Sequence, residues 1–340
     1  MSLGRRRFLS LSLGGVAVFA AGRLAWRGLE RPASENVVTR RAWALGSHVS
    51  MTVMGLPTDR AERALDAAFA ELELVEQVLS LYRPNSQVCR LNRDRVLQQP
   101  HPYFLAVLAM AEQTSRQSDG AFDITVQPLW VLFAACQKQG RLPTDSQIAA
   151  ARACVDWRAV EVLRDHIHLR APATAITLNG IAQGFAADRA IAALRDHGVE
   201  HALVNSGEIG CLGRKPDGRD WTVGVQHPRE PDAFVALPAL RGRSLATSGD
   251  YETTFSADFS KNHIFDPHTG QSPSELASVS IAAPTAMQAD ALSTAAMVLG
   301  ADRTLALIET LADVDALLVL KQGRMRRTPG FLQVEKRYDG

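Results

Sequence analysis

The chain has 340 residues, of which 46% are hydrophobic and 21% are charged, and its formal net charge is +1. This length and composition allow a sizeable buried core, in one large domain or in two closely packed lobes. Basic residues form no block beyond the N-terminus, so nothing in the composition indicates a nucleic-acid-binding protein. The sequence contains no recognisable internal repeat and no low-complexity segment.

Residues 1–30 have the features of a twin-arginine signal segment. Three arginines at positions 5–7 are followed by Phe-Leu, which matches the R-R-x-F-L core of such signals. The apolar stretch over residues 11–21 is too short and too weakly hydrophobic to predict a transmembrane helix. We expect export to the periplasm by the twin-arginine machinery; an uncleaved segment that tethers the protein to the inner membrane is the alternative. Residues 31–39 are typical of a polar linker, and one domain is expected over residues 40–335.

The first elements predicted after the linker are a strand and a long helix. Residues 41–54 contain an alternating apolar pattern that predicts a strand. Thr58 or Asp59 is expected to cap a helix that continues to Leu79, because apolar side chains recur there with the 3.6-residue period of a helix face. Such a stripe is typical of core packing and not of a cofactor site.

Later segments are assigned by the same patterns of apolar residues and glycines. The expected elements are a helix over 102–118, a helix and a hairpin within 130–173, a helix that ends near 197, a strand and a glycine turn over 202–213, a helix over 302–311 and a closing hairpin over 316–328. The four cysteines, at positions 89, 136, 154 and 211, match no zinc-binding spacing, so we expect mostly buried thiols.

The most informative stretch lies in the third quarter of the chain. Residues 278–283 alternate apolar and polar side chains and predict a strand. A helix is expected to follow, with Thr285 as its N-cap and Gly300 as its C-cap. Asp290 and Thr294 are four residues apart and therefore share one face of this alanine-rich helix.

Two interpretations of that face are open. A carboxylate on an apolar helix face is unfavourable to bury without a partner. A hard cation such as Mg²⁺ would be a suitable partner for Asp290, because it prefers oxygen ligands. The alternative is structural: the helix dipole favours an acidic residue near the N-terminus, and Thr294 could bond back to a carbonyl oxygen. The helix alone favours the structural interpretation.

A rigid turn precedes this strand. Residues 266–270, Asp-Pro-His-Thr-Gly, combine a proline that fixes φ with a glycine that permits positive φ. His263 lies just before the turn, in the short strand-like segment Asn-His-Ile-Phe. Such a turn can hold a histidine and an aspartate with little entropy lost on binding. On its own, His263 is better described as a half-buried histidine of a strand.

Together, these motifs resemble those of the ApbE flavin transferases, the FAD:protein FMN transferases. The family pattern T-S-G-D-Y matches residues 247–251, H-x-x-D-P-x-T-G matches residues 263–270, and A-D-A-L-x-T matches residues 289–294. Further matches are Ser-Asp-Gly-Ala-Phe-Asp at 118–123 and Ile-Ala-Gln-Gly-Phe-Ala-Ala-Asp at 181–188. The motifs follow the family's order, and the resemblance covers nearly all of the expected domain.

The resemblance implies an α+β fold: a two-lobed ApbE-like domain related to the T-fold, in which mixed or antiparallel sheets are flanked by helices and FAD lies in the cleft. It implies Mg²⁺-dependent transfer of FMN from FAD to a threonine or serine hydroxyl of a partner flavoprotein, with release of AMP. The family positions that contact FAD correspond here to Leu45, Tyr82, Ala121, Phe122, Asp123, Thr177, Gln183, Thr247, Ser248, Gly249, Asp250 and His263.

The resemblance also suggests which residues carry the chemistry. Asp290, Thr294 and the backbone carbonyl of Gly180 match the metal site of the family. His263 is the candidate base for the acceptor hydroxyl. Tyr82 matches an aromatic residue of the family that packs on the flavin. Without the resemblance, an aromatic residue that closes a helix end is an equally good interpretation of Tyr82.

Three residues depart from the common family pattern. Thr177 stands where aspartate is usual, Asn179 where glycine is common, and Gln183 where lysine or glutamate is usual. These side chains can still form hydrogen bonds but carry no charge. The variant resembles a NosX-like subgroup that is associated with nitrous-oxide respiration. Two other functions therefore stay open: a periplasmic flavin-binding or assembly factor without catalysis, and a pyrophosphatase that hydrolyses FAD to FMN and AMP.

Overall fold

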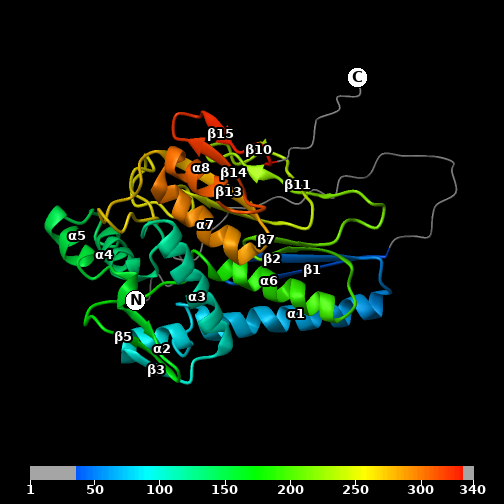
Figure 1. Ribbon diagram of the computed structural model, residues 1–340, viewed down its shortest axis with the longest axis horizontal. Helices are drawn as coiled ribbons and strands as arrows, with labels where there is room; N and C mark the ends of the chain where they lie inside the picture. Colours follow the sequence, from blue (N-terminus) through cyan, green and yellow to red (C-terminus); the bar gives the residue numbers. More distant parts are fainter. Residues whose placement is uncertain (1–35, 332–340) are drawn as a thin grey trace, which may run out of the picture.

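The central element of the structure is an eight-stranded antiparallel sheet. The computed structural model describes residues 36–331 of the chain (Figure 1). The strand order across the sheet is β1-β2-β6-β7-β12-β13-β14-β15. The strands are β1 (Val37–Ala44), β2 (Ser47–Met54), β6 (His201–Asn205), β7 (Ile209–Leu212), β12 (Ser244–Gly249), β13 (Leu276–Ala283), β14 (Asp315–Leu320) and β15 (Met325–Arg327).

The sheet is built from two halves with the same topology. The N-terminal half runs β1-β2-α1-α6-β6-β7, with a long insert between its helices, and the C-terminal half runs β12-β13-α7-α8-β14-β15. In each half the strands lie side by side in chain order and pair antiparallel. The halves meet where β7 pairs with β12, and the ladder there joins one pair of described residues, Ile209 and Leu245. This seam separates two lobes, and the arrangement confirms the predicted α+β class.

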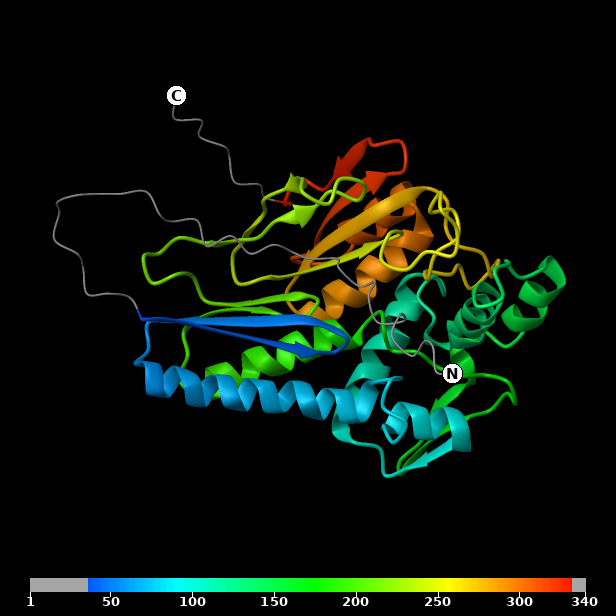
Figure 2. The same ribbon diagram turned by 180° about the vertical axis from the view of Figure 1, so that it is seen from behind.

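Four helices cover one face of the sheet. They are α1 (Thr58–Leu79), α6 (Ala182–Asp196), α7 (Ala286–Leu299) and α8 (Ala301–Glu309). Figures 1 and 2 show α1, α6 and α7 lying alongside one another against the sheet. Apolar side chains of α1 and α6 bury a core against β2 and β6, and those of α7 and α8 bury a second core against β13 and β14. The two cores meet where α6 packs against α7, beneath the seam.

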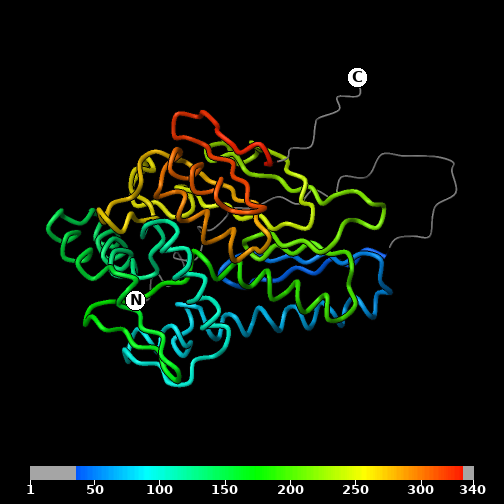
Figure 3. Tube along the Cα trace, viewed as in Figure 1, coloured from blue at the N-terminus to red at the C-terminus, as the bar shows by residue number. Residues whose placement is uncertain are grey.

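The insert between α1 and α6 forms a separate group of elements. It contains α2 (Gln87–Asp94), β3 (Val96–Gln98), α3 (Pro102–Gln117), η1 (Ile124–Val126), α4 (Gln127–Gln137), α5 (Asp145–Arg152), η2 (Trp157–Ala159), β4 (Val160–Val162) and β5 (His166–Leu169). Strands β3, β5 and β4 pair into a small sheet. The Cα trace in Figure 3 shows the insert, in cyan to green, gathered at one end of the molecule.

Short strands cover the face of the large sheet that the helices leave open. They are β8 (Trp221–Thr222), β9 (Val225–Gln226), β10 (Phe234–Ala236) and β11 (Ala239–Leu240), which form two two-stranded ladders. Trp221 belongs to a buried cluster that also contains Leu203, Leu245 and Leu317 of the large sheet. Both faces of the central strands are therefore buried.

The structure corrects two boundaries near the N-terminus of the domain. β1 begins at Val37, so residues 37–39 of the predicted linker belong to the sheet. The segment 41–54, predicted as a strand, is part of a hairpin. Leu45 and Gly46 turn the chain between β1 and β2 with φ values of 53° and 73°.

Two further predictions of local structure are wrong. Helix α1 begins at Thr58 with Pro57 in the N-cap position, so neither Thr58 nor Asp59 caps it. Pro57 already has the extended backbone that a cap position requires, with φ −55° and ψ 142°. His263 does not lie in a strand, because its segment forms no ladder beyond an isolated bridge next to it.

The helix after β13 was predicted correctly, including both caps. Thr285 Oγ1 accepts a hydrogen bond from the Gln288 amide, and Gly300 ends α7 with a φ of 78°. The helices predicted over 102–118 and 302–311 are confirmed as α3 and α8 to within two residues at each end.

The cysteines and the N-terminal segment complete the comparison with the sequence. All four cysteines are free thiols; Cys136 and Cys211 are buried, whereas Cys89 and Cys154 are half-buried. Over residues 36–331, no helix has the length and apolar character that crossing a bilayer needs. The predicted signal segment lies outside the residues that the structure describes.

Candidate functional site

A cavity of about 870 Å³ opens where the two halves of the sheet and the insert meet. Ligand sites in proteins commonly have volumes of about 300–1,000 Å³, so this cavity could accept a large ligand. The predicted FAD and metal positions that line it are Leu45, Tyr82, Ala121, Phe122, Asp123, Thr177, Gly180, Gln183, Thr247, Ser248, Gly249, His263, Asp290 and Thr294. The structure thus brings these distant segments of the chain together around one cavity, and Asp250 alone of the predicted residues does not line it.

Asp290, Thr294 and Gly180 meet at one corner of the cavity. The Asp290 side chain is buried, and its Oδ2 accepts a hydrogen bond of 2.9 Å from the Gly184 amide. Gly180 lies so close to α7 that a Cβ atom there would be 2.8 Å from Thr294 Oγ1. Thr294 Oγ1 is in turn 3.3 Å from Ser248 Oγ. Side-chain oxygen atoms from α7 and β12 therefore converge at this corner, next to Gly180 in the segment before α6.

The N-terminus of α7 is satisfied by another residue, Asp188 of α6. Its two carboxylate oxygens accept hydrogen bonds of 2.8 Å and 2.9 Å from the amides of Ala286 and Met287. Burial raises the pKa of Asp188 to about 6, although these two bonds lower it. Asp188 thus accepts the hydrogen bonds of the first amides of α7. Asp290 does not bond to them and lines the cavity corner.

Glu208 is a cavity residue that the sequence interpretation treated as part of the scaffold. Beyond the end of the β7–β12 ladder, its Oε2 accepts a hydrogen bond of 3.1 Å from the Thr247 amide. The residue is 8% exposed, and burial, followed by the charge of Asp290, raises the pKa of Glu208 well above its ordinary value. Burial likewise raises the pKa of Asp290. The position of Glu208 directly before the apolar strand β7 is the one feature of the sequence that could have indicated a buried carboxylate.

The cavity as a whole is acidic. Its carboxylates belong to Glu76, Asp123, Glu208, Glu252 and Asp290. Among the described residues that line it, Arg83 alone has a lysine or arginine side chain, and this guanidinium is already paired with Glu73 and Glu76. When these carboxyl groups are ionised, a diphosphate is repelled from the cavity unless a cation accompanies it.

The oxygen-rich corner fits Mg²⁺. This ion takes oxygen ligands and is commonly bound by one or two carboxylates together with substrate phosphates. Asp290 provides a carboxylate, Thr294 and Ser248 provide hydroxyls, and Gly180 provides a backbone carbonyl. Within residues 36–331, no cluster of three or more His, Cys, Asp or Glu side chains is arranged to hold a metal. The corner thus suits a cation that shares its coordination with a bound phosphate, and it does not suit a closed site such as structural zinc.

The β1–β2 turn forms one wall of the cavity and is held from both sides. The Leu45 amide donates a hydrogen bond of 2.7 Å to Glu76 Oε1, and Glu76 is also paired with Arg83. The Leu45 carbonyl accepts a bond of 3.4 Å from Gln183 Nε2. Gln183 fits there because Gly207 has no side chain; a Cβ atom at Gly207 would lie 2.5 Å from Nε2. The neutral Gln183 therefore lies between the β1–β2 turn and the β6–β7 turn.

His263 is oriented by a single carbonyl group. Thr253 O accepts hydrogen bonds from the His263 amide at 3.0 Å and from its ring Nδ1 at 3.3 Å. Because a carbonyl oxygen only accepts, this contact assigns the ring proton to Nδ1 and leaves Nε2 able to accept a proton in the neutral imidazole. Burial lowers the pKa of His263 and outweighs the opposite effects of the Thr253 bond and of the Asp250 charge. The imidazole is therefore neutral at pH 7.

Two carboxylates near the cavity hold local backbone in place. Asp123 accepts hydrogen bonds from the amide and the hydroxyl of Thr125 and from the Trp157 amide, and it caps η1. Burial raises the pKa of Asp123. Asp266 accepts bonds from the His268 amide and the Thr269 hydroxyl within its turn. Both carboxylates are thus engaged by neighbouring residues, and an FAD contact of Asp123 stays a prediction.

Asp250 lies next to the cavity and is not among the residues that line it, so its FAD contact stays a prediction. It is fully buried and follows the last residue of β12. Its carboxylate oxygens lie 2.7 Å and 2.8 Å from the guanidinium of Arg229, and Lys321 Nζ lies 3.4 Å away. Two cations from other parts of the chain therefore hold this carboxylate beside the cavity and not inside it.

Exposed aromatic side chains stand at the rim of the cavity. Trp43 is 57% exposed and Tyr82 is 73% exposed, although both line the cavity. A second, shallower depression of about 670 Å³ shares Tyr82 and Arg83 with the rim. The predicted packing of Tyr82 on a flavin stays a prediction.

Comparison with known proteins agrees with the fold. The ApbE family model matches residues 45–318. The FAD:protein FMN transferase of Salmonella typhimurium is 29% identical over 298 residues, which cover 84% of this chain and 84% of that protein. The apo structure of Pseudomonas stutzeri flavinyl transferase ApbE has 31% identity and a TM-score of 0.75, over 86% of this chain and 94% of that one. The structure of the ApbE protein from Thermotoga maritima has 27% identity and a TM-score of 0.79, over 87% and 98% of the two chains. This chain therefore belongs to the ApbE family.

Proposed function

We propose that this protein transfers FMN from FAD to a hydroxyl group of a partner flavoprotein and releases AMP. The relatives named above include an FAD:protein FMN transferase and a flavinyl transferase. The observation that carries the proposal to this chain is the corner formed by Asp290, Thr294 and Gly180, in an acidic cavity that also contains His263. Buried carboxylates and an oriented histidine are the groups that phosphoryl chemistry uses, and simple flavin binding does not require them.

The reaction joins a threonine or serine oxygen of the acceptor to the phosphorus atom next to the flavin. As this bond forms, the bond from that phosphorus to the bridging oxygen of the pyrophosphate breaks, and AMP leaves with the electron pair. The acceptor hydroxyl must lose its proton. His263 is the base in this proposal, because Nδ1 is committed to Thr253 O and Nε2 can accept.

Mg²⁺ is the cation of this proposal. When bound, it would offset the negative charge of the diphosphate and of the departing AMP. Asp290, Thr294 and the carbonyl of Gly180 are the residues that would hold it. Asp290 uses Oδ2 for the Gly184 amide, so Oδ1 is available to a cation. Because burial raises the pKa of Asp290, a proton competes with the cation for this carboxylate at low pH.

The acceptor is proposed to be a periplasmic flavoprotein of nitrous-oxide respiration. Support comes from the sequence: the R-R-x-F-L motif at residues 5–9 favours export by the twin-arginine machinery. The neutral residues Thr177, Asn179 and Gln183 resemble the NosX-like variant of the family.

Incubation with FAD and Mg²⁺, with and without a co-expressed candidate acceptor, tests this function. Transfer predicts that the acceptor gains the mass of FMN less one water and that one AMP appears for each modified acceptor. AMP release without acceptor would instead indicate a pyrophosphatase, and FAD binding without AMP release would indicate a carrier. Asp290→Asn should lower transfer sharply at the Mg²⁺ concentration that half-saturates the wild type, whereas Asp302→Asn, a control at an exposed ion pair with Arg326, should not.

A further inference from the structure

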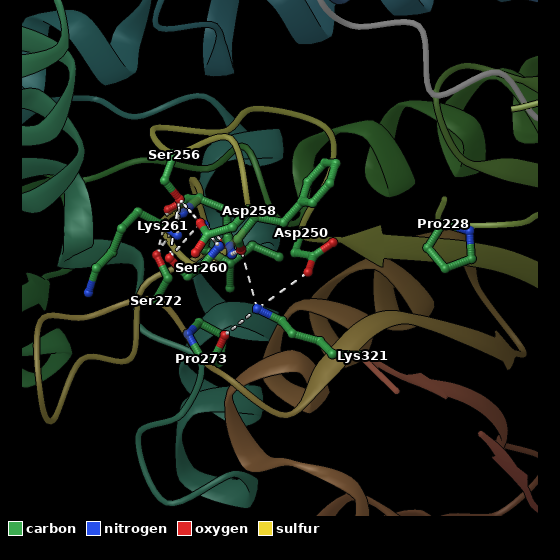
Figure 4. Close-up of polar contacts among 12 residues, drawn as sticks. Pro228, Asp250, Ser256, Asp258, Ser260, Lys261, Ser272, Pro273 and Lys321 are labelled. Atoms are coloured by element: carbon green, nitrogen blue, oxygen red, sulfur yellow. Dashed lines mark hydrogen bonds and ion pairs between the residues drawn. The ribbon is translucent and has the colours of Figure 1, made fainter. Parts of the chain in front are cut away.

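The segment that carries His263 is held by charged residues from outside the cavity. It connects β12 to β13 over residues 250–275 and forms no helix or ladder there, apart from one isolated bridge. Arg229, from the loop between β9 and β10, and Lys321, from the turn after β14, both reach it. Figure 4 shows the Lys321 side chain extending between Asp250 and Pro273.

Lys321 joins three separate points of this segment. Its Nζ lies 3.4 Å from Asp250 Oδ2 at the start of the segment. The same Nζ donates hydrogen bonds of 3.2 Å to Phe259 O and 3.4 Å to Pro273 O. The Lys321 side chain is 19% exposed, so these charge-assisted contacts are largely shielded from water. One ammonium group therefore fixes the start, the middle and the end of the segment.

Arg229 holds two of the same residues. It forms a bidentate pair with Asp250, and its guanidinium lies 4.2 Å from the centre of the Phe259 ring. Phe259 has a φ of 61°, a left-handed conformation that a non-glycine residue keeps only when its surroundings impose it. We name Arg229, Asp250, Phe259 and Lys321 the clasp.

Hydrogen bonds lead from the clasp to His263. Phe259 O accepts a second bond, of 3.3 Å, from Asn262 Nδ2. Asn262 is fully buried, and its Oδ1 accepts a bond of 3.0 Å from the Ile264 amide. Asn262 and Ile264 are the two neighbours of His263 in the chain. The position of Phe259 therefore sets the backbone on both sides of the histidine.

A second route reaches the same residues through the end of the segment. Ser272 precedes Pro273, whose carbonyl Lys321 holds. Ser272 Oγ accepts a bond of 2.9 Å from the Asn262 amide and donates one of 2.8 Å to the Asn262 carbonyl. Lys321 is thus connected to Asn262 in two ways: directly through the Phe259 carbonyl, and through Pro273 and its neighbour Ser272.

We propose that Lys321 and Arg229 are positioning residues for His263. Neither lines the cavity, and both act through Asp250 and Phe259. The inference rests on the proposed FMN transfer, in which His263 takes the proton of the acceptor. A displacement of about 1 Å can lower a reaction rate by roughly 10²-fold, because a base must lie within hydrogen-bond reach of the proton. Loss of the clasp therefore reduces transfer while the cavity walls that contact FAD stay in place.

Lys321→Met tests the proposal, with Lys261→Met as its matched control. Lys261 lies in the same segment, but its Nζ bonds to Gln271 Oε1 at 2.6 Å and not to the clasp. We expect Lys321→Met to lower single-turnover FMN transfer to a co-expressed acceptor, at saturating FAD and Mg²⁺, by roughly 10–100-fold. Its FAD affinity, measured by flavin fluorescence, should stay within roughly threefold of wild type. Lys261→Met should leave both quantities unchanged, and Lys321→Arg should restore most of the transfer rate.

Amide hydrogen exchange provides a reading that does not depend on activity. In Lys321→Met, exchange should accelerate over residues 250–275 and stay unchanged in α1 and α6. If Lys321→Met fails to fold, Arg229→Met is measured in its place, and it should show the same local acceleration of exchange. The proposal would be overturned if both variants exchanged the amides of residues 250–275 at the wild-type rate. It would also be overturned if FAD affinity fell as much as the transfer rate. If the wild-type protein transfers no FMN, the proposed function fails, but local acceleration of exchange still supports the clasp and its absence still refutes it.

Discussion

Gly184→Ala tests how closely α6 and α7 approach beneath the seam. A Cβ atom at Gly184 would collide with the backbone carbonyl of Ala286 and lie 2.7 Å from the Cβ of Asp290. Neither obstacle is the end of a flexible side chain, so the two helices must move apart. That movement would also stretch the bond of 2.9 Å from the Gly184 amide to Asp290 Oδ2.

Three effects decide the magnitude of this change. Alanine is favoured over glycine in a helix interior by about 1 kcal/mol. Overpacking of a tight contact costs about 1–3 kcal/mol. The loss of a hydrogen bond to a buried carboxylate costs about a further 1.5–3 kcal/mol. The free energy of unfolding should therefore fall by about 1.5–5 kcal/mol, because the steric and hydrogen-bonding effects exceed the gain in helix propensity.

Urea unfolding, followed by circular dichroism, measures this difference. Gly210→Ala is the comparison, because a Cβ atom there would meet one side-chain atom, Ile191 Cγ1, at 3.0 Å and no backbone atom closer than 3.7 Å, so its stability should fall by less than that of Gly184→Ala. A Gly184→Ala protein as stable as wild type, or more stable, would mean that helix propensity prevails. The close contact between α6 and α7 would then be refuted.

Four other predictions concern the metal, the base, a buried carboxylate and export. Asp290→Asn should increase the Mg²⁺ concentration needed for half-maximal FMN transfer, and an unchanged Mg²⁺ titration would contradict a metal role. His263→Ala should lower transfer at saturating FAD by roughly 10²–10⁴-fold. At saturating Mg²⁺, which displaces the proton from Asp290, wild-type transfer should decline only below about pH 6.5 in a pH–rate profile, because burial lowers the pKa of His263. The pKa of Asp188 is raised from 3.8 to about 6, so the folded protein binds this proton more tightly than the unfolded chain does. Stability should therefore decrease as the pH rises through about 6, and Asp188→Asn should flatten that decrease in urea unfolding at successive pH values. Replacement of Arg5 and Arg6 by lysine should retain the protein in the cytoplasm on cell fractionation, and normal export would exclude the twin-arginine interpretation.

Elements whose signals are contiguous in the chain could be predicted from the sequence. Helix α7 is one example, because Thr285 and Gly300 define its ends and an alanine-rich pattern lies between them. The β1–β2 hairpin could not be predicted in the same way. Leucine is unusual at positive φ, and the turn at Leu45 depends on Glu76, which lies 31 residues further along the chain.

The parts of the site that the sequence does not show depend on partners from distant elements. Nothing near Asp250 in the sequence indicates that Arg229 and Lys321 will pair with its buried carboxylate. Glu208 was missed for a similar reason, because its burial follows from the separation of β7 and β12. The two halves share a topology, but no repeat is recognisable in the sequence. Many different sets of apolar residues can form the same pattern of strands and helices.

The seam between the two halves has a mechanical consequence. With one residue pair in the β7–β12 ladder, the sheet itself transmits little bending force from one lobe to the other. The halves are joined mainly by the packing of α6 against α7 and by carboxylates that receive amide hydrogens across the seam: Glu208 from Thr247, Asp290 from Gly184, and Asp188 from the first turn of α7. The two halves are therefore joined by helix packing and side-chain hydrogen bonds more than by sheet hydrogen bonds. If FAD binds in the cavity between the halves, as the proposed function requires, it should add a further link between them and slow amide exchange where α6 meets α7.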